Sequence, residues 1–240
     1  MFLALFLAHS GVCLHSASAN IVMRTVIIAN GEPPTGDDLQ TWLRDGDTLI
    51  CADGGARAAL AYGLLPERVI GDFDSLTDAE LDRLAQRGVL LERHPTNKDE
   101  TDLELALLHS ASTGSDEIVV LGALGGRLDQ TVANVMLLAM PQLSGHKVLI
   151  ASGAEQTFIL RPGTPCELTG HVGDVISLIP FGGDITGINT EGLAYPLHDE
   201  PLFFGPARGV SNVLLGERAT ISFTSGLLLC VQATGQGNNL

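Results

Sequence analysis

The sequence predicts an α/β domain with a parallel sheet, followed by a C-terminal antiparallel β-sandwich domain. Two observations predict this arrangement. From residue 24 to about residue 152, short apolar and β-branched runs alternate with stretches of helical periodicity. After residue 161, Gly, Pro and Thr become frequent and the helical periodicity disappears. A chain of 240 residues is long enough to form two such domains, each with a core of its own.

The apolar runs of the first part are predicted to be strands with helices on both faces of their sheet. Nearly all of their residues are apolar, as burial on two faces requires, and the β-α alternation indicates parallel strands. The strands are predicted at 24–30, 47–51, 68–71, 89–93, 116–121 and 147–151. The amphipathic stretches between them are predicted to be helices at 77–86, 101–111 and 127–140.

The second part of the chain is predicted to consist of short antiparallel strands. Alternating runs recur in DVISLIPF at 174–181, NVLLGERATISF at 212–223 and GLLLCVQA at 226–233. The change of pattern at Pro162 places the boundary there. Residues 23–161 are therefore expected to form the α/β domain and residues 162–240 the β-sandwich.

Residues 1–22 are predicted to lie outside the fold. The run MFLALFLA is apolar and AlaSerAla at 17–19 resembles the cleavage site of a secretory signal. However, no Lys or Arg precedes Arg24, and the apolar run is too short to span a membrane. We expect a mis-assigned start or a dispensable leader, with Met23 as the functional start and a cytoplasmic location for the protein.

The composition argues against several partners and reaction classes. The formal net charge is −15, from 28 acidic and 13 basic residues, so we expect neither nucleic acid nor a membrane surface as a partner. The four cysteines form no C-x-x-C pair, which favours a reducing compartment. Neither a Walker-type phosphate loop nor a G-x-S-x-G nucleophile turn occurs, and no G-x-G-x-x-G follows the first predicted strand.

Aspartates follow the ends of several predicted strands. They lie in CADGG (Asp53), VIGDFDS (Asp72 and Asp74), NKDETD (Asp99 and Asp102) and LGGRLDQ (Asp129). Because ligands of an open parallel sheet bind at the carboxyl ends of its strands, these side chains should converge on one crevice. Asp99 or Asp129 taken alone can equally be an acid at the start of a helix.

The pair Asp72 and Asp74 indicates a divalent cation. Two residues apart in an extended segment, their carboxylates would share one face and repel each other without a cation. Oxygen ligands at this spacing suit Mg²⁺, which bridges carboxylates to phosphates. Arg127 follows Gly125-Gly126 at the expected start of a helix, where free N–H groups and a guanidinium suit phosphate oxygens.

Taken in order, these segments resemble the thiamin pyrophosphokinase family. The matching segments share acidic or glycine-rich motifs: DGG at 53–55, GDFDS at 71–75, KDETD at 98–102 and GGRLDQ at 125–130, with Asn134 following. GLAYPL at 192–197 and GVSN at 209–212 resemble segments of that family that face thiamin. The resemblance covers roughly residues 24–232, and several motifs in the right order are far more specific than any one of them.

The resemblance implies a homodimer with shared active sites that transfers the diphosphate group of ATP to the hydroxyl of thiamin, giving thiamin diphosphate and AMP. It implies Mg²⁺ held by Asp72, Asp74 and Asp102, and ATP bound by Asp53, Gly54, Gly55, Lys98, Asp99, Thr101, Arg127 and Gln130. Tyr195, Ser211 and Asn212 would face thiamin. Asp72, Asp129 and Arg127 would be catalytic, and either Asp72 or Asp129 would accept the proton of the hydroxyl.

Two positions depart from the family pattern. Gln130 stands where many bacterial members have His, and Gln can still form a hydrogen bond. Tyr195 stands where many animal members have Trp, and Tyr can still stack on a ring. Two other interpretations remain. Aspartate-nucleophile phosphatases and nucleotide-sugar transferases also carry D-x-D after a strand, but they leave LGGRLDQ unexplained. A module that senses thiamin diphosphate without turnover would not need the intact acidic set.

Overall fold

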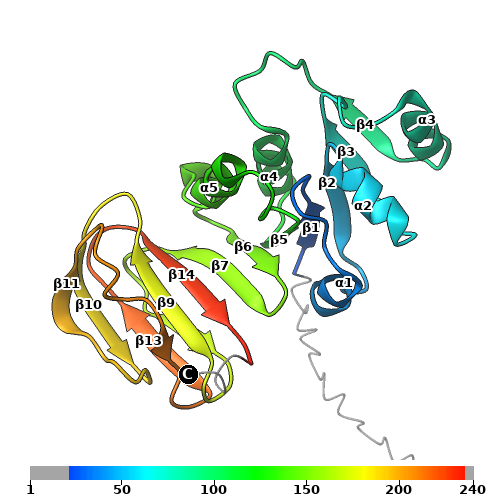
Figure 1. Cartoon of the computed structure of the whole chain (residues 1–240). Coiled ribbons are helices and arrows are strands. Elements are labelled where there is room, and N and C mark those ends of the chain that lie inside the picture. The colour runs from blue at the N-terminus through cyan, green and yellow to red at the C-terminus, as the bar shows by residue number, and fades with distance from the viewer. Residues whose placement is uncertain (1–21, 236–240) are drawn as a thin grey trace, which may run out of the picture.

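The computed structural model describes residues 22–235, in which a ten-stranded mixed sheet extends through the molecule (Figure 1). Apart from Val22, the leader predicted for residues 1–22 lies outside the described residues. The parallel part of the sheet has the order β6-β5-β1-β2-β3-β4. Its strands are β1 (Arg24–Ile28), β2 (Thr48–Ala52), β3 (Arg68–Gly71), β4 (Leu90–Arg93), β5 (Glu117–Leu121) and β6 (Lys147–Ser152).

The parallel strands are buried on both faces, as their apolar sequences predict. In β1, Val26 and Ile28 pack with the helices on one face, and Ile27 packs into the core on the other. All three side chains are fully buried, and each contributes about 1.5–3 kcal/mol by leaving water. The register aligns Ile28 with Cys51 in β2 and Leu121 in β5, so these strands end at the same edge of the sheet.

Helices connect the parallel strands: α1 (Gly36–Trp42), α2 (Gly55–Ala61), α3 (Asp78–Gln86), α4 (Asp102–Ser112), α5 (Leu128–Leu137) and the 3₁₀ turn η1 (Pro141–Leu143). The three predicted helices correspond to α3, α4 and α5. Helix α5 ends earlier than predicted: Met140, which precedes Pro141, has a ψ of 132°, outside the helical region. The predicted helices did not include α1 and α2, which have seven residues each.

The C-terminal strands form two sheets packed on one core. They are β7 (Glu155–Leu160), β8 (Cys166–Thr169), β9 (Val175–Pro180), β10 (Ile185–Glu191), β11 (His198–Leu202), β12 (Asn212–Val213), β13 (Arg218–Ser222) and β14 (Leu228–Ala233). Strands β8, β10, β11 and β13 make a separate four-stranded antiparallel sheet. Residues such as Leu168 and Ile221 from this sheet pack on Ile176 and Leu178 of the larger one. The predicted fold class, α/β followed by a β-sandwich, is confirmed.

The larger sheet is continuous between the two parts of the chain. Strand β7 pairs antiparallel with β6 on one side and with β14 on the other, and β9 and β12 follow β14. The alternation of residues along a strand does not reveal its partner, so the sequence did not indicate this continuity. The boundary between residues 161 and 162 stays a prediction.

Candidate active site

The carboxyl ends of the parallel strands open on a cavity of about 470 Å³, within the usual size range of ligand sites. Asp53 follows β2, and its backbone N–H donates to Ile70 O of β3, so the two strand ends meet. Residues that lie far apart in the sequence line this cavity together: Asn30, Asp53, Asp74, Ser75, Lys98, Thr101, Asp102, Arg127, Gln130 and Asn134. Of the acids expected to converge on one crevice, Asp53, Asp74 and Asp102 line this cavity, whereas Asp72, Asp99 and Asp129 are not among its lining residues.

Asp53 is the most buried carboxylate of this cavity. Its exposed fraction is 3%, and its Oδ1 atom has no hydrogen-bond partner among the described residues. Burial raises the pKa of Asp53, and the neighbouring charges of Asp102 and Asp74 raise it further, against hydrogen bonds from Ser75 and the Gly54 backbone. A bound cation would stabilise the charged form of a carboxylate that is buried among like charges in this way.

Asp72 and Asp74 lie in a turn, whereas the sequence suggested an extended segment. Phe73 between them has a φ of +66°, and the Asp74 N–H donates to Asp72 Oδ1 at 3.1 Å. A bulky residue in this left-handed region costs about 1–3 kcal/mol. The expected extended backbone is therefore wrong, but the two carboxylates still meet. One oxygen each of Asp53, Asp72 and Asp74 lie within 4.8 Å of one another.

Gly71 brings Asp102 to the same place. A Cβ at this position would lie 3.0 Å from Asp53 Cβ and 3.1 Å from Asp102 Cγ, so a side chain would push these two residues apart. Lys98 Nζ forms an ion pair with Asp102 Oδ1 at 2.8 Å. Thr101 caps helix α4, because its side chain accepts a hydrogen bond from Glu104 N.

Gly54 and Gly55 pack the start of α2 against β1. A Cβ at Gly54 would lie 2.3 Å from Asn30 Oδ1, and one at Gly55 would lie 2.0 Å from Ile28 O. Both positions therefore need glycine for contact with the chain itself. Asp99, which the family resemblance places among the ATP-binding residues, is exposed and is not among the cavity-lining residues.

Arg127 and Asp129 form an exposed ion pair at the start of α5. Arg127 Nη2 lies 2.5 Å from Asp129 Oδ2, and Arg127 Nε donates to Asp129 Oδ1 at 3.1 Å. These hydrogen bonds from Arg127 lower the pKa of Asp129. Asn134 donates to Ala123 O at 2.7 Å and so ties α5 to the loop that carries Gly125 and Gly126.

The three residues predicted to face thiamin lie together in the C-terminal part. The Asn212 side chain is buried and bonds both backbone groups of Tyr195: its Nδ2 donates to Tyr195 O at 2.8 Å, and its Oδ1 accepts from Tyr195 N at 3.0 Å. Ser211 has a φ of +60° and donates its N–H to Ser177 Oγ. Tyr195 is 70% exposed. None of the three is among the residues that line the cavity beside the aspartates.

Sequence reasoning missed Asn30, which lies at the carboxyl end of β1. Its Nδ2 is 3.0 Å from Ser75 Oγ and 3.4 Å from Asp53 Oδ2, so it joins the ends of β1, β2 and β3. The rule that found Asp53 could have found it, since Asn30 is a polar residue at the carboxyl end of the first predicted strand, 24–30.

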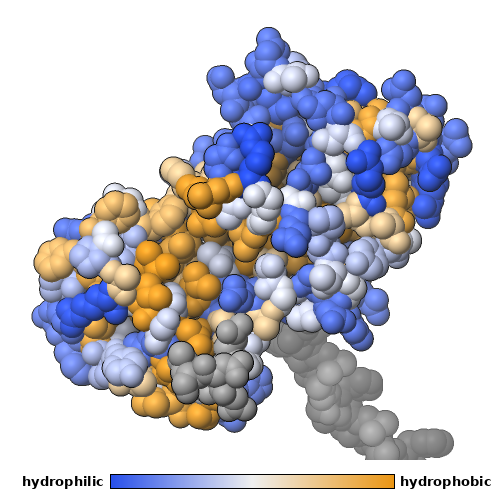
Figure 2. Space-filling model, viewed as in Figure 1, coloured by the Kyte–Doolittle hydropathy of each residue, from blue (hydrophilic) through white to orange (hydrophobic). Residues whose placement is uncertain are grey.

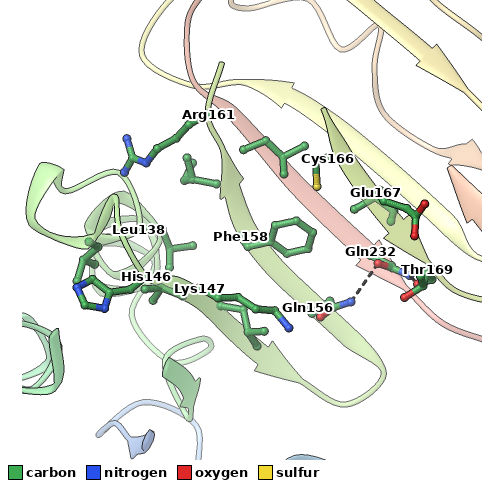
Figure 3. A pocket seen from close by; sticks show the side chains of 16 residues that line it. Leu138, His146, Lys147, Gln156, Phe158, Arg161, Cys166, Glu167, Thr169 and Gln232 are labelled. Atoms are coloured by element: carbon green, nitrogen blue, oxygen red, sulfur yellow. Dashed lines mark hydrogen bonds between the residues drawn. The ribbon is translucent and has the colours of Figure 1, made fainter. Parts of the chain in front are cut away.

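A second cavity, of about 320 Å³, lies where β6 and β7 diverge (Figure 3). Phe158 points into it, and Lys147, Arg161 and Glu167 lie around it. Arg161 donates to the carbonyl oxygens of Ala139 and Met140 near the end of α5. None of the residues predicted to be functional lines this cavity.

Comparison with known proteins shows which family this chain resembles. The model of the thiamin pyrophosphokinase catalytic domain matches residues 39–150, and that of the thiamin pyrophosphokinase vitamin B1 binding domain matches residues 166–228. Thiamine pyrophosphokinase of Bacillus subtilis is 30% identical over 213 residues, which are 88% of this chain and 100% of that protein. The chain belongs to the thiamin pyrophosphokinase family.

Solved structures of thiamin pyrophosphokinases share the fold. The Bacillus subtilis structure superposes with a TM-score of 0.78 at 29% identity, covering 88% of this chain and 99% of that one. The Geobacillus thermodenitrificans structure has a TM-score of 0.77 at 26% identity, covering 89% and 99%. The segment matched by the catalytic model contains all the aspartates of the cavity, and the segment matched by the vitamin B1 model contains Tyr195, Ser211 and Asn212. Within residues 22–235, no helix has the length and apolar character needed to cross a membrane.

Proposed function

We propose that this chain is a thiamin diphosphokinase that transfers the diphosphate group of ATP to the hydroxyl of thiamin. The thiamin oxygen attacks the β-phosphorus in line, the bond from that phosphorus to the α-phosphate oxygen breaks, and AMP leaves. Membership of the thiamin pyrophosphokinase family supports this activity, since both domains of the family are present in one chain. The observation that carries the proposal is the convergence of Asp53, Asp72 and Asp74 at the carboxyl edge of the sheet.

The carboxylates of the cavity fit a hard divalent cation such as Mg²⁺. The oxygens of Asp53, Asp72 and Asp74 lie within 4.8 Å of one another, and the buried Asp53 Oδ1 atom has no partner among the described residues. We infer that these three would hold the ion, with Asp102 beside them. A bound Mg²⁺ would neutralise charge on the triphosphate as AMP leaves.

The basic residues of the site would bind and orient the triphosphate. Lys98 is largely buried and balances Asp102, and Arg127 lies at the start of α5, where free backbone N–H groups also attract anions. A phosphate can replace Asp129 as the partner of the Arg127 fork. The lowered pKa of Asp129 makes it a weak proton acceptor as long as this ion pair persists.

We further propose that two chains form a homodimer that shares its active sites. Within one chain, the predicted thiamin-facing residues do not line the cavity of the aspartates. Leu128, Val132 and Met136 form an exposed apolar stripe along α5, and Leu128 is 76% exposed. Figure 2 shows apolar residues gathered on one face, over α5 and over the β9 and β14 region of the sheet. Covering these surfaces with a second copy would remove them from water.

A product assay tests the proposed activity. The protein is incubated with ATP, Mg²⁺ and thiamin, with Asp74→Asn as the matched inactive control. We expect AMP and thiamin diphosphate to appear in equal amounts. Hydrolysis of ATP or of a phosphate ester without thiamin would instead indicate a phosphatase, and binding of thiamin diphosphate with no turnover would indicate a sensor. A cytoplasmic location stays a prediction.

A further inference from the structure

Arg93 holds the turn between Asp72 and Asp74 from the neighbouring strand. It is the last residue of β4 and lies opposite Gly71 of β3 in the register. Its Nη1 donates to Asp72 O at 2.8 Å, and its guanidinium lies over the Phe73 ring, 4.7 Å from the ring centre. One side chain therefore contacts both the backbone before Phe73 and the ring of Phe73.

The turn that Arg93 contacts is strained. Phe73 is 5% exposed and has a φ of +66°, a conformation that a bulky residue rarely adopts. Such a conformation persists only where the surrounding structure enforces it, and it is concentrated at functional sites. Relaxation of Phe73 to an extended backbone would change the direction of Asp72 relative to Asp74.

We propose that Arg93 is a positioning residue that keeps Phe73 in its left-handed conformation and so holds the carboxylates of Asp72 and Asp74 at the spacing that binds a divalent cation. This inference rests on the proposed function, in which these carboxylates hold the metal. Arg57 contacts the segment directly after this turn, because its Nη2 donates to Ser75 O at 2.6 Å. The site is thus fixed by arginines that do not themselves contact the cation.

The charge of Arg93 and its proposed positioning role have opposite effects on cation affinity, which makes the inference testable. A positive charge near a cation site weakens cation binding, so its removal by Arg93→Met should strengthen binding if charge alone matters. If Arg93 positions the carboxylates, the same substitution should weaken binding. Loss of a group that orients a metal ligand typically costs about tenfold or more in affinity.

The test is a titration of the nucleotide-free protein with Mn²⁺, with free Mn²⁺ measured by electron paramagnetic resonance. We expect Arg93→Met to raise the Mn²⁺ dissociation constant by about tenfold. Arg93→Lys keeps the charge and one donor, and we expect it to restore part of the loss. Arg83→Met is the matched control: Arg83 is exposed on α3, and the same change of charge there should leave the constant within about twofold.

Unchanged or tighter Mn²⁺ binding by folded Arg93→Met would overturn the inference, as would equal weakening in Arg83→Met. If Arg93→Met does not fold, judged by circular dichroism, Arg93→Lys must still bind Mn²⁺ more weakly than the wild type. Mn²⁺ binding and formation of thiamin diphosphate test the inference and the proposed function separately. A wild type that binds Mn²⁺ as expected but makes no thiamin diphosphate would refute the proposed function only. Equal Mn²⁺ binding by Asp74→Asn and the wild type would refute the metal site and the inference together.

Discussion

Replacing Asp53 by Asn should make the metal-free protein more stable and the enzyme far less active. Asp53 is buried beside two other carboxylates, and its pKa is raised by burial and by the charges of Asp102 and Asp74. At an effective dielectric constant of 20, two unit charges 4.8 Å apart repel by about 3.5 kcal/mol, and 4.8 Å is the largest separation of the oxygens of Asp53, Asp72 and Asp74. Solvent screening and relaxation reduce this value, so we expect a gain of about 1–2 kcal/mol in the free energy of unfolding.

The assay is thermal unfolding without divalent metal, followed by circular dichroism. A gain of about 1–2 kcal/mol corresponds to a rise of roughly 2–8 °C in Tm for a protein of this size. Asp45→Asn is the matched control, because Asp45 is exposed and undergoes the same chemical change. Activity should move in the other direction, with kcat/KM reduced by about 10²-fold or more through the loss of a charged oxygen ligand.

The stability difference between Asp53→Asn and the wild type should depend on pH. The pKa of Asp53 is raised in the folded state, so the folded wild type favours the protonated carboxyl group. The contribution of Asp53 to the stability of the wild type is therefore present at low pH and is lost as pH rises through the folded pKa. The two proteins should therefore unfold alike at about pH 3, below the usual Asp pKa, and the variant should gain its advantage as pH rises above about 4. Saturating Mg²⁺ should remove that advantage. Lower stability of the variant at pH 7 without metal would refute the reasoning.

Further predictions concern the metal, the thiamin side and the dimer. Asp74→Asn should lower kcat/KM by about 10²-fold or more, roughly 2.7 kcal/mol, and near-normal turnover at ordinary Mg²⁺ would show that the metal is held elsewhere. Tyr195→Ala should weaken thiamin binding several-fold, since aromatic stacking on a cationic ring contributes about 0.5–2 kcal/mol, and calorimetry should find ATP binding nearly unchanged. Mixing Asp74→Asn subunits with subunits carrying a severely impairing β-domain substitution at Asn212 should restore some activity; no recovery despite confirmed subunit exchange would contradict shared sites.

The parallel sheet and the meeting of Asp53, Asp74 and Asp102 at one cavity could be predicted, because both follow from simple rules. Apolar runs such as Val26–Ile28 are long and periodic enough to indicate buried strands, and strand ends of a parallel sheet share one edge. The position of Asp53 beside Asp74 follows from these two facts. Helix α2 escaped prediction because its seven residues, GARAALA, are too few and too uniformly small to show an amphipathic period.

The local geometry of the turn between Asp72 and Asp74 could not be predicted from the sequence. Phe is a residue that avoids a positive φ, so nothing in GDFDS indicates the left-handed conformation of Phe73. Arg93, which contacts Asp72 O and the Phe73 ring, lies on another strand and becomes their neighbour only in the folded chain. The pairing of β7 with β14 is non-local in the same way, since it joins residues 155–160 to residues 228–233.

Following the β-phosphorus of ATP tests the central claim most directly. ATP labelled with ³²P at the β-position is incubated with the protein, Mg²⁺ and thiamin, and the products are separated by chromatography. Attack of the thiamin hydroxyl on the β-phosphorus predicts that the converted label appears in thiamin diphosphate, with unlabelled AMP formed in equal amount. Label accumulating in ADP, together with thiamin monophosphate, would contradict diphosphate transfer.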